Sequence, residues 1–213
     1  MYYDIEKPNH GLLHDPLKAL VSPRPIAWVG SISPDGRNNL APYSFFNLVS
    51  DRPAMIMFSS CGHKDSLENI NATSEFSLSI VTQSLINAMN MSSATVASDI
   101  DEFELSGLTP VPCVRIAAPR VRESPAALEC KLWKLLPLRL NQEDPSLSWT
   151  MVIASIVGVH ISEEVIVDRK VDTKHLLPVG RLGYMEYCSV SEQSIFELRR
   201  PEVSPNGYVV GKK

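Results

Sequence analysis

The chain has 213 residues, of which 44% are hydrophobic and 21% charged, and its formal net charge is −4. These values are typical of one folded domain with a full core, and they exclude wholesale disorder. The acidic balance excludes the broad basic surface used to bind nucleic acid or anionic membranes, and no run approaches the roughly 18 apolar residues of a membrane helix.

The N-terminal residues include acidic side chains where a signal peptide would be basic, so we expect a cytoplasmic protein. Four cysteines lie far apart with no C-x-x-C pair, which favours free thiols in a reducing compartment over disulfides or a zinc site: Cys61, Cys113, Cys130 and Cys188. His10 and His14 are four residues apart, but Gly11 interrupts them and no third ligand is near, so no metal site is expected. His160 is expected to be a hydrogen-bonded core or interface group.

Residues 1–22 are expected to form an irregular leader with a short helix near residues 16–20, which covers an opening or reaches a neighbouring molecule. The next stretch, residues 23–47, predicts a β-hairpin. Its first arm, residues 26–32, is rich in strand-forming side chains, and the Ser-Pro-Asp-Gly sequence after it is typical of a type I turn.

The second arm of this hairpin is unusually polar and small for a buried strand. It contains Asn38, Asn39, Ala41, Ser44 and Asn47, and Pro42 removes one ladder donor. Two interpretations fit equally well. The arm is either an edge strand protected against aggregation or an edge whose free backbone groups meet a ligand.

Residues 54–59 predict a short buried strand, followed by a polar loop and a short helix containing the sequence LENINAT. Asp65 or Ser66 is expected to cap this helix. A helix N-terminus preceded by serines, glycine and Lys64 offers N–H groups, a favourable dipole and a cation to a phosphate. The alternative is an ordinary capped surface helix with a solvated lysine.

Strands are predicted at residues 75–81 and within 120–132, and short helices at 84–91 and 101–105, the latter held by Phe103 and Leu105. The longest apolar run, residues 149–161, predicts a strand buried on both faces with a bend at Gly158. Residues 188–213 are expected to form a tail on a single domain spanning residues 1–213. Several strands without strand–helix alternation indicate a mainly β, antiparallel barrel.

The chain lacks the sequence motifs of Rossmann dinucleotide binding, P-loops, α/β-hydrolases and zincins. What it does contain resembles a known family. The sequence PRPIAWVGSISPDGRNNLAPYSFFN is followed by the K-D-S loop, then by ESPAALEC and by GRLG. Together these segments resemble the flavin reductase-like family of FMN-binding split barrels, which includes flavoredoxins and reductase components of two-component monooxygenases.

The resemblance implies a six-stranded antiparallel Greek-key split barrel with a few short peripheral helices, which forms a homodimer and holds FMN near the subunit interface. It implies that the flavin ring edge meets backbone and side-chain groups of Pro42, Tyr43, Ser44, Phe45 and Asn47. Trp28 and Phe46 are possible ring neighbours, with a core role as the alternative for each, and Arg181 approaches the flavin. The phosphate would be met by Arg24, Ser31, Ser59 or Ser60, Lys64, and the helix start at Asp65 and Ser66.

Two functions follow from this resemblance. The first is an NAD(P)H-dependent FMN reductase, which binds and orients its cofactor and needs no catalytic acid or nucleophile of its own. A monooxygenase or another acceptor would then receive the electrons. The second is a non-enzymatic FMN electron carrier that excludes the nicotinamide, an alternative favoured by Tyr184, whose ring could crowd the face where a nicotinamide would stack.

Overall fold

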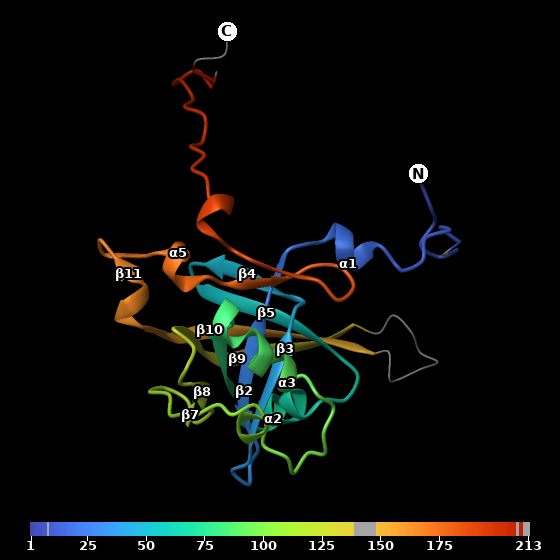
Figure 1. The fold of residues 1–213 in the computed structure, drawn as a ribbon, viewed down its shortest axis with the longest axis vertical. Helices are drawn as coiled ribbons and strands as arrows, with labels where there is room; N and C mark the ends of the chain where they lie inside the picture. Colours follow the sequence, from blue (N-terminus) through green and yellow to red (C-terminus); the bar gives the residue numbers. More distant parts are fainter. Residues whose placement is uncertain (8, 139–147, 208, 211–213) are drawn as a thin grey trace.

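The computed structural model describes residues 1–7, 9–138, 148–207 and 209–210. Its centre is a seven-stranded antiparallel sheet (Figure 1). In spatial order the strands are β3 (Asn38–Tyr43), β2 (Ala27–Ile32), β6 (Glu75–Ile80), β9 (Ala126–Leu138), β10 (Trp149–Ile161), β5 (Ala54–Cys61) and β4 (Phe46–Asp51). The protein is therefore mainly β, as predicted.

The sheet curls until its two ends meet. β3 and β4 lie at opposite ends of the strand order, yet only Ser44 and Phe45 separate them in the chain. Close to this junction the backbone N–H of Ser59 on β5 donates to the carbonyl of Phe45 at 2.9 Å. The expected count of six strands is not confirmed, because the second arm of the predicted hairpin breaks at Ser44 and Phe45 into two strands with different partners.

Smaller elements surround this sheet. A three-stranded sheet contains β1 (Arg24–Pro25), β13 (Val179–Arg181) and β14 (Tyr187–Ser189), and two-stranded pairs are formed by β7 (Pro110–Val111) with β8 (Arg120–Val121) and by β11 (Ile166–Val167) with β12 (Lys170–Val171). The helices are α1 (Leu17–Leu20), α2 (Asp65–Thr73), α3 (Ile86–Met91), α4 (Glu102–Leu105) and α5 (Thr173–Leu176), with 3₁₀ turns η1 (Gln83–Leu85), η3 (Glu163–Val165) and η4 (Glu192–Ser194). The C-terminal tail leaves the body of the molecule (Figure 1).

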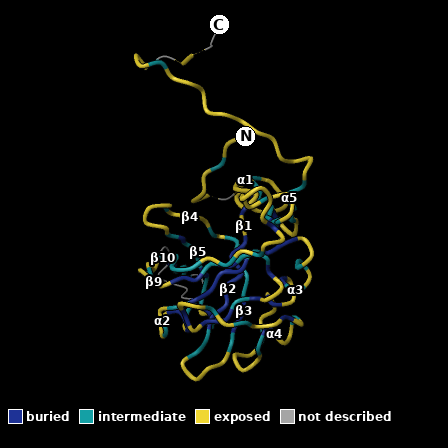
Figure 2. Tube along the Cα trace, turned by 90° about the vertical axis from the view of Figure 1, so that its left-hand side faces the viewer, coloured by how far each residue is buried: buried dark blue, intermediate teal, exposed yellow. Residues whose placement is uncertain are grey.

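The core has two parts, one inside the curled sheet and one beneath the helices. The first is centred on Phe58, Phe76 and Leu78, whose side chains are fully buried. The second contains Trp28 and Phe103, also fully buried. Figure 2 shows the buried positions concentrated along β2 and its neighbours, whereas the leader and tail are exposed. Burial of these side chains provides most of the free energy that holds the barrel together.

Three local predictions were wrong. β10 is not buried on both faces: its pattern includes only Val152 and Ala154 as buried positions, and most of its other residues are half-buried. α2 begins after Lys64 without a described side-chain cap, and Ser66 instead donates to Asn39. Leu105 is 40% exposed, so Phe103 alone anchors α4 in the core. The predicted irregularity at Gly158 is confirmed as a register shift in the β9–β10 pairing.

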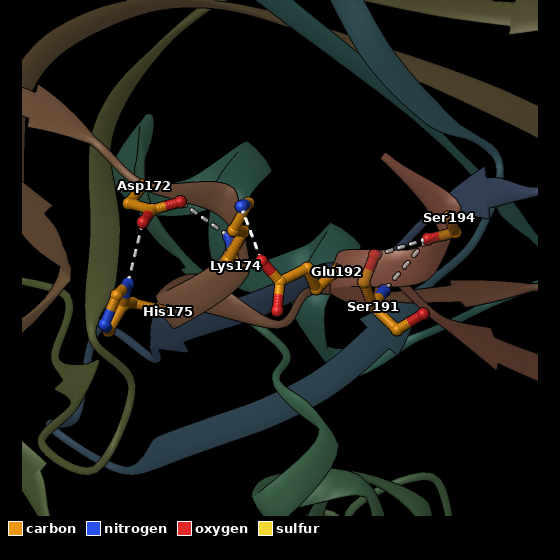
Figure 3. A network of polar contacts seen from close by, with 6 residues as sticks. All are labelled: Asp172, Lys174, His175, Ser191, Glu192 and Ser194. Atoms are coloured by element: carbon orange, nitrogen blue, oxygen red, sulfur yellow. Dashed lines mark hydrogen bonds and ion pairs between the residues drawn. The ribbon is translucent and has the colours of Figure 1, made fainter. Parts of the chain in front are cut away.

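A network of polar contacts joins α5 to η4, the segments that precede and follow the β13–β14 hairpin in the chain (Figure 3). Asp172 caps α5 by accepting from the backbone N–H of Lys174 at 2.9 Å, and it also bonds His175 Nδ1 at 2.8 Å. Lys174 Nζ in turn forms an ion pair with Glu192 of η4 at 2.8 Å. Each of these exposed contacts contributes little stability, but together they hold the two segments that flank the hairpin in the chain, α5 and η4, against each other. None of the helices described is long and apolar enough to cross a membrane.

Candidate functional site

Three adjoining cavities form one continuous groove beside the β3–β4 junction. Their volumes are about 310, 510 and 760 Å³. The 310 and 510 Å³ cavities share Pro42 and Ser93 in their walls, and the 510 and 760 Å³ cavities share residues that include Arg24 and Phe45. The polar second arm of the predicted hairpin therefore lines the groove along its length.

The first end of the groove is the N-terminus of α2. Lys64, Asp65 and Ser66 line the 310 Å³ cavity, and no side chain among the described residues caps the helix at Lys64. The N–H of Leu67 donates to the Lys64 carbonyl at 2.9 Å, which leaves the first two N–H groups of the helix, at Asp65 and Ser66, and the positive end of the helix dipole to face a ligand. The exposed lysine adds a full positive charge beside them. This end is suited to an anion.

Tyr43 and Ser60 form the inner wall behind this cavity. Burial raises the pKa of the Tyr43 phenol above its ordinary value, although hydrogen bonding with Ser66 opposes the effect. The phenol is therefore a neutral donor throughout the physiological range. Ser60 is 1% exposed, and its hydroxyl lies beside the Tyr43 phenol, where hydrogen bonding also opposes the rise in the pKa of Tyr43. Ser60 does not itself line the three cavities, so it supports the position of Tyr43 from behind.

A buried polar network supports the helix end from below. Asn39 accepts from Ser66 Oγ at 2.7 Å and from Ser31 Oγ at 3.1 Å, and Asn69 Nδ2 donates to Ser31 at 3.1 Å. Glu102 of α4 accepts from Asn39 Nδ2 and from the backbone N–H of Leu40. This network fixes β3, α2 and α4 relative to one another, and it therefore fixes the shape of the cavity.

Burial raises the pKa of the Glu102 carboxyl above its ordinary value, and the nearby charge of Asp65 raises it further. The carboxyl group lines the same cavity as Lys64. Hydrogen bonds from the Leu40 N–H and from Asn39 oppose this rise in the pKa.

Arg24 forms the floor of the other two cavities. Its guanidinium donates to the carbonyls of Lys18 and Val21 at 2.5 Å each and to that of Leu182 at 2.8 Å, while its Nε has no partner among the residues described. The guanidinium lies 5.9 Å from the centre of the Phe45 ring. Burial, and then the charge of Arg181, lower the pKa of Arg24. A ligand atom that accepts a hydrogen bond from Arg24 Nε would give this donor a partner, and it would offset part of the cost of burying the guanidinium charge.

Arg181 faces the 510 Å³ cavity from β13, where it is paired in register with Arg24. Its guanidinium donates to the hydroxyl of Tyr187 and to the carbonyl of Tyr184, and it lies 4.3 Å from the Tyr187 ring centre. The arginine is therefore held in place by one aromatic ring and one turn. Two guanidinium groups at one end of a groove favour electron-rich oxygen or nitrogen atoms in the ligand.

The leader and the β13–β14 turn form the outer wall of the groove. Lys18 of α1 lines both larger cavities, and Tyr184 faces it from the turn. The Tyr184 ring packs against His14 with centroids 5.2 Å apart, and its φ of 55° is unusual for a residue other than glycine. The leader therefore does cover an opening of the chain's own fold.

The structure brings most of the predicted site residues to this groove. Arg24, Pro42, Tyr43, Ser44, Phe45, Lys64, Asp65, Ser66 and Arg181 all line it. Ser59 and Ser60 lie behind it on β5, where Ser59 is half-buried. The other predicted residues are placed elsewhere.

Trp28 is fully buried in the core, and its indole N–H donates to Ser92 Oγ at 2.9 Å, so its placement supports the core alternative. Phe46 packs against the core inside the sheet. Ser31 belongs to the buried polar network, and Asn47 is exposed on β4, where its side chain accepts from the backbone N–H of Leu48. None of these four residues lines the three cavities, and contact of any of them with a ligand stays a prediction.

Several groove residues were not identified from the sequence. Glu102, Tyr187, Lys18 and the loop of residues 92–98 all contribute to the walls. The only available signal was the largely irregular character of the leader, which indicated a covering segment without naming its side chains.

Comparisons with known proteins identify the family of the chain. The model of the flavin reductase like domain family matches residues 20–176. A protein of Aquifex aeolicus is 31% identical over 194 residues, which cover 88% of this chain and 94% of the relative.

Solved structures give the same result. Nitrilotriacetate monooxygenase component B from Bacillus cereus superposes with a TM-score of 0.84 at 29% identity, covering 93% of this chain and 98% of that chain. The 2-nitrobenzoate 2-nitroreductase of Pseudomonas fluorescens gives 0.81 at 29% identity, with 96% and 98% covered. Flavoredoxin of Desulfovibrio vulgaris gives 0.75 at 25% identity, with 88% and 95% covered. On this match over most of its length, the chain belongs to the flavin reductase-like domain family.

Proposed function

We propose that this protein binds FMN in the groove and acts as a flavin reductase that passes hydride from NAD(P)H to FMN. The observation that carries the proposal is the presence of positively charged groups at both ends of the groove. Lys64 and the α2 N-terminus lie at one end, and Arg24 with Arg181 lies at the other. FMN has a phosphate at one end and a polar ring edge at the other, so both of its ends find cations.

The residues present fit FMN on grounds of their own chemistry. Arg24 lines two of the cavities, and its buried Nε, which has no partner within the described chain, needs an acceptor that a ligand can supply. The wall of the 510 Å³ cavity also contains Pro42, which has no backbone N–H, and small side chains that let a ligand approach the backbone closely. Lys64 and the free helix end would hold the phosphate.

When bound, FMN supplies the hydride and electron chemistry, and the chain supplies binding, orientation and exclusion of water. Arg24 and Arg181 would place positive charge beside the ring edge, which would favour the electron-rich reduced form. Phe45 and the leader residues that line the 760 Å³ cavity would form a wall against the ring. No side chain is required to transfer a proton to a substrate carbon.

A second function, electron carriage without NAD(P)H, is favoured by one observation. Tyr184 and His14 pack on each other across the 760 Å³ cavity and narrow the space in which a nicotinamide would stack on the flavin. A carrier of this kind would exchange electrons with protein partners. In either case a monooxygenase or another acceptor protein is the proposed destination of the electrons.

The visible absorption spectrum of the purified protein, before and after anaerobic addition of NADH or NADPH, tests these functions. Flavin bands that bleach within seconds support the reductase. Flavin bands that persist with both nucleotides but bleach with dithionite support the carrier. A protein that fails to bind even added FMN contradicts the groove assignment.

We also propose that the protein is a homodimer. Leu48 and Val49 of β4, Trp133 of β9 and Val159 of β10 are each more than half exposed. β9, β10, β5 and β4 are consecutive in the sheet, and a second copy would cover apolar side chains exposed on them. Sedimentation equilibrium should give twice the chain mass for the native protein. Trp133→Glu should shift the equilibrium towards monomer, and an unchanged dimer would exclude Trp133 from the interface.

A further inference from the structure

A second cluster of chemically capable side chains lies outside the groove, at the β9–β10 pair. Cys113, Glu129 and His160 place one sulfur, oxygen or nitrogen atom each within 4.8 Å of one another. Glu129 comes from β9, His160 from β10, and Cys113 from the loop between β7 and β8. None of the three lines the groove.

Glu129 organises the cluster. Its side chain is 1% exposed, and its two oxygens accept from the backbone N–H groups of Val114 at 2.8 Å and Arg115 at 2.6 Å. These N–H groups belong to the two residues directly after Cys113, so the carboxylate also fixes the position of the thiol. A side chain at Gly158 would meet Glu129, since its Cβ would lie 3.0 Å from Glu129 Cδ. The register shift at Gly158 thus makes room for the carboxylate beside His160.

We propose that Cys113, Glu129 and His160 form a binding site for a thiophilic divalent cation, with Zn²⁺ as the best match. Thiolate, imidazole and carboxylate are the three protein ligands that zinc uses. One thiolate and one carboxylate balance the charge of the ion, and the imidazole binds as a neutral ligand. The backbone N–H groups of Val114 and Arg115 supply the outer hydrogen bonds that orient a ligating carboxylate.

Binding of the ion would require a small movement of the His160 and Glu129 side chains. His160 Nε2 lies 2.6 Å from Glu129 Oε1. Two ligand atoms on one tetrahedral zinc ion are roughly 3.3 Å apart, because each bond is about 2.0–2.1 Å long. The cation would therefore replace the proton shared by this pair and separate the two side chains by less than 1 Å. His160 is 23% exposed, so the ion can reach the site from solvent.

No fourth His, Cys, Asp or Glu joins the cluster in the described part of the chain, so a water molecule would complete the tetrahedron. Such a three-ligand site is open and binds more weakly than a closed four-ligand site. The three segments that it would join, the β7–β8 loop, β9 and β10, are already held together by Glu129. The ion would therefore add stability to a formed site and would not be required for folding.

The test is a zinc titration of flavin-free, tag-free protein after chelation and dialysis, in competition with a chromophoric chelator. We expect one zinc ion per chain, and at least tenfold weaker binding for Cys113→Ser and for His160→Gln. Cys188→Ser is the matched control, since it removes a half-buried thiol that lies outside the cluster, and it should bind zinc like the native protein. Glu129 is left intact because its loss would strand two backbone donors.

Addition of Co²⁺ gives a second signal. A thiolate-to-cobalt charge-transfer band should form in the native protein and in Cys188→Ser, and it should be absent from Cys113→Ser. Circular dichroism and FMN affinity check that each variant is folded. Native protein that binds zinc no more tightly than Cys113→Ser, or a cobalt band that survives that substitution, would overturn the proposal without affecting the proposed flavin function.

Discussion

Gly183 lies so close to Ala19 that no side chain fits between them. A Cβ atom on Gly183 would lie 2.5 Å from the Cβ of Ala19 and 2.8 Å from its Cα. This contact joins the leader helix α1 to the β13–β14 turn, and both of these segments line the larger cavities of the groove. The glycine is therefore needed because another piece of backbone approaches it closely.

Gly183→Ala should displace the leader while leaving the barrel folded. The added methyl group cannot be accommodated unless α1 moves, so residues 1–22 should be cleaved faster by a non-specific protease. FMN affinity should fall by several-fold, because one wall of the groove moves. Adding Ala19→Gly should restore part of both properties, since it removes the nearer of the two clashing atoms. Cleavage of the leader at the native rate would show that the β13–β14 turn moves to accommodate the methyl group and that α1 stays in place.

Lys64→Ala should weaken FMN binding by about 1–3 kcal/mol, which is the range for a hydrogen bond assisted by charge. The effect should shrink at high salt because Lys64 is exposed. Fluorescence quenching of FMN gives the dissociation constant. Lys170→Ala, an exposed lysine on β12 outside the groove, is the matched control and should leave the affinity unchanged. An affinity within twofold of the native value for Lys64→Ala would remove this lysine from the site.

Patterns local to the chain predicted much of this fold. The alternation of Phe76, Leu78 and Ile80 predicted β6, and the polar arm ending at Asn47 indicated a ligand edge as one of two possibilities. The groove along that arm now favours the ligand edge. The sequence pattern did not predict that this arm would form two strands with different partners. β3 pairs with β2 and β4 pairs with β5, and this change of partner depends on how the whole sheet closes.

Contacts between distant segments could not be predicted from sequence pattern. Arg24 was assigned to a phosphate, yet it donates to carbonyls of the leader and of Leu182, 158 residues away. Ser31 was expected to meet a ligand and instead bonds Asn39 and Asn69. A serine or arginine has the same local signature whether its partner is a ligand or a buried side chain, so only tertiary structure separates the two.

Trp28→Phe should destabilise the protein without changing FMN affinity. The indole is fully buried, and the smaller ring leaves a cavity and leaves Ser92 Oγ without its donor. Together these losses should lower the free energy of unfolding by about 2–4 kcal/mol, measured by urea denaturation. Ser92→Ala removes the acceptor of the indole N–H and the bond from Ser92 Oγ to the Met89 carbonyl, but it leaves the packing of Trp28 intact and should cost less. A large fall in FMN affinity in a folded Trp28→Phe variant would show that Trp28 belongs to the proposed flavin site.

Glu102→Gln should change how the stability depends on pH. Burial raises the pKa of this carboxyl in the folded state, so the folded protein holds the proton more tightly than the unfolded chain does. The stabilisation that this provides is present at acid pH and is lost as the pH rises from the unfolded value towards the raised folded value. Glutamine does not titrate, so its variant should lack this loss.

The measurement is the free energy of unfolding in urea from about pH 4 to about pH 8 for the native protein and the variant. Because glutamine can accept from Leu40 N–H but cannot also accept every bond from Asn39, the variant should lose about 1 kcal/mol at acid pH. With rising pH the difference should narrow and can reverse, since the native protein then holds a buried charge. Glu104→Gln, on the exposed face of the same helix, is the control and should run parallel to the native curve. A difference that stays constant or widens with pH would show that the charged form of Glu102 is the one the fold favours, with Asn39 and Leu40 outweighing burial.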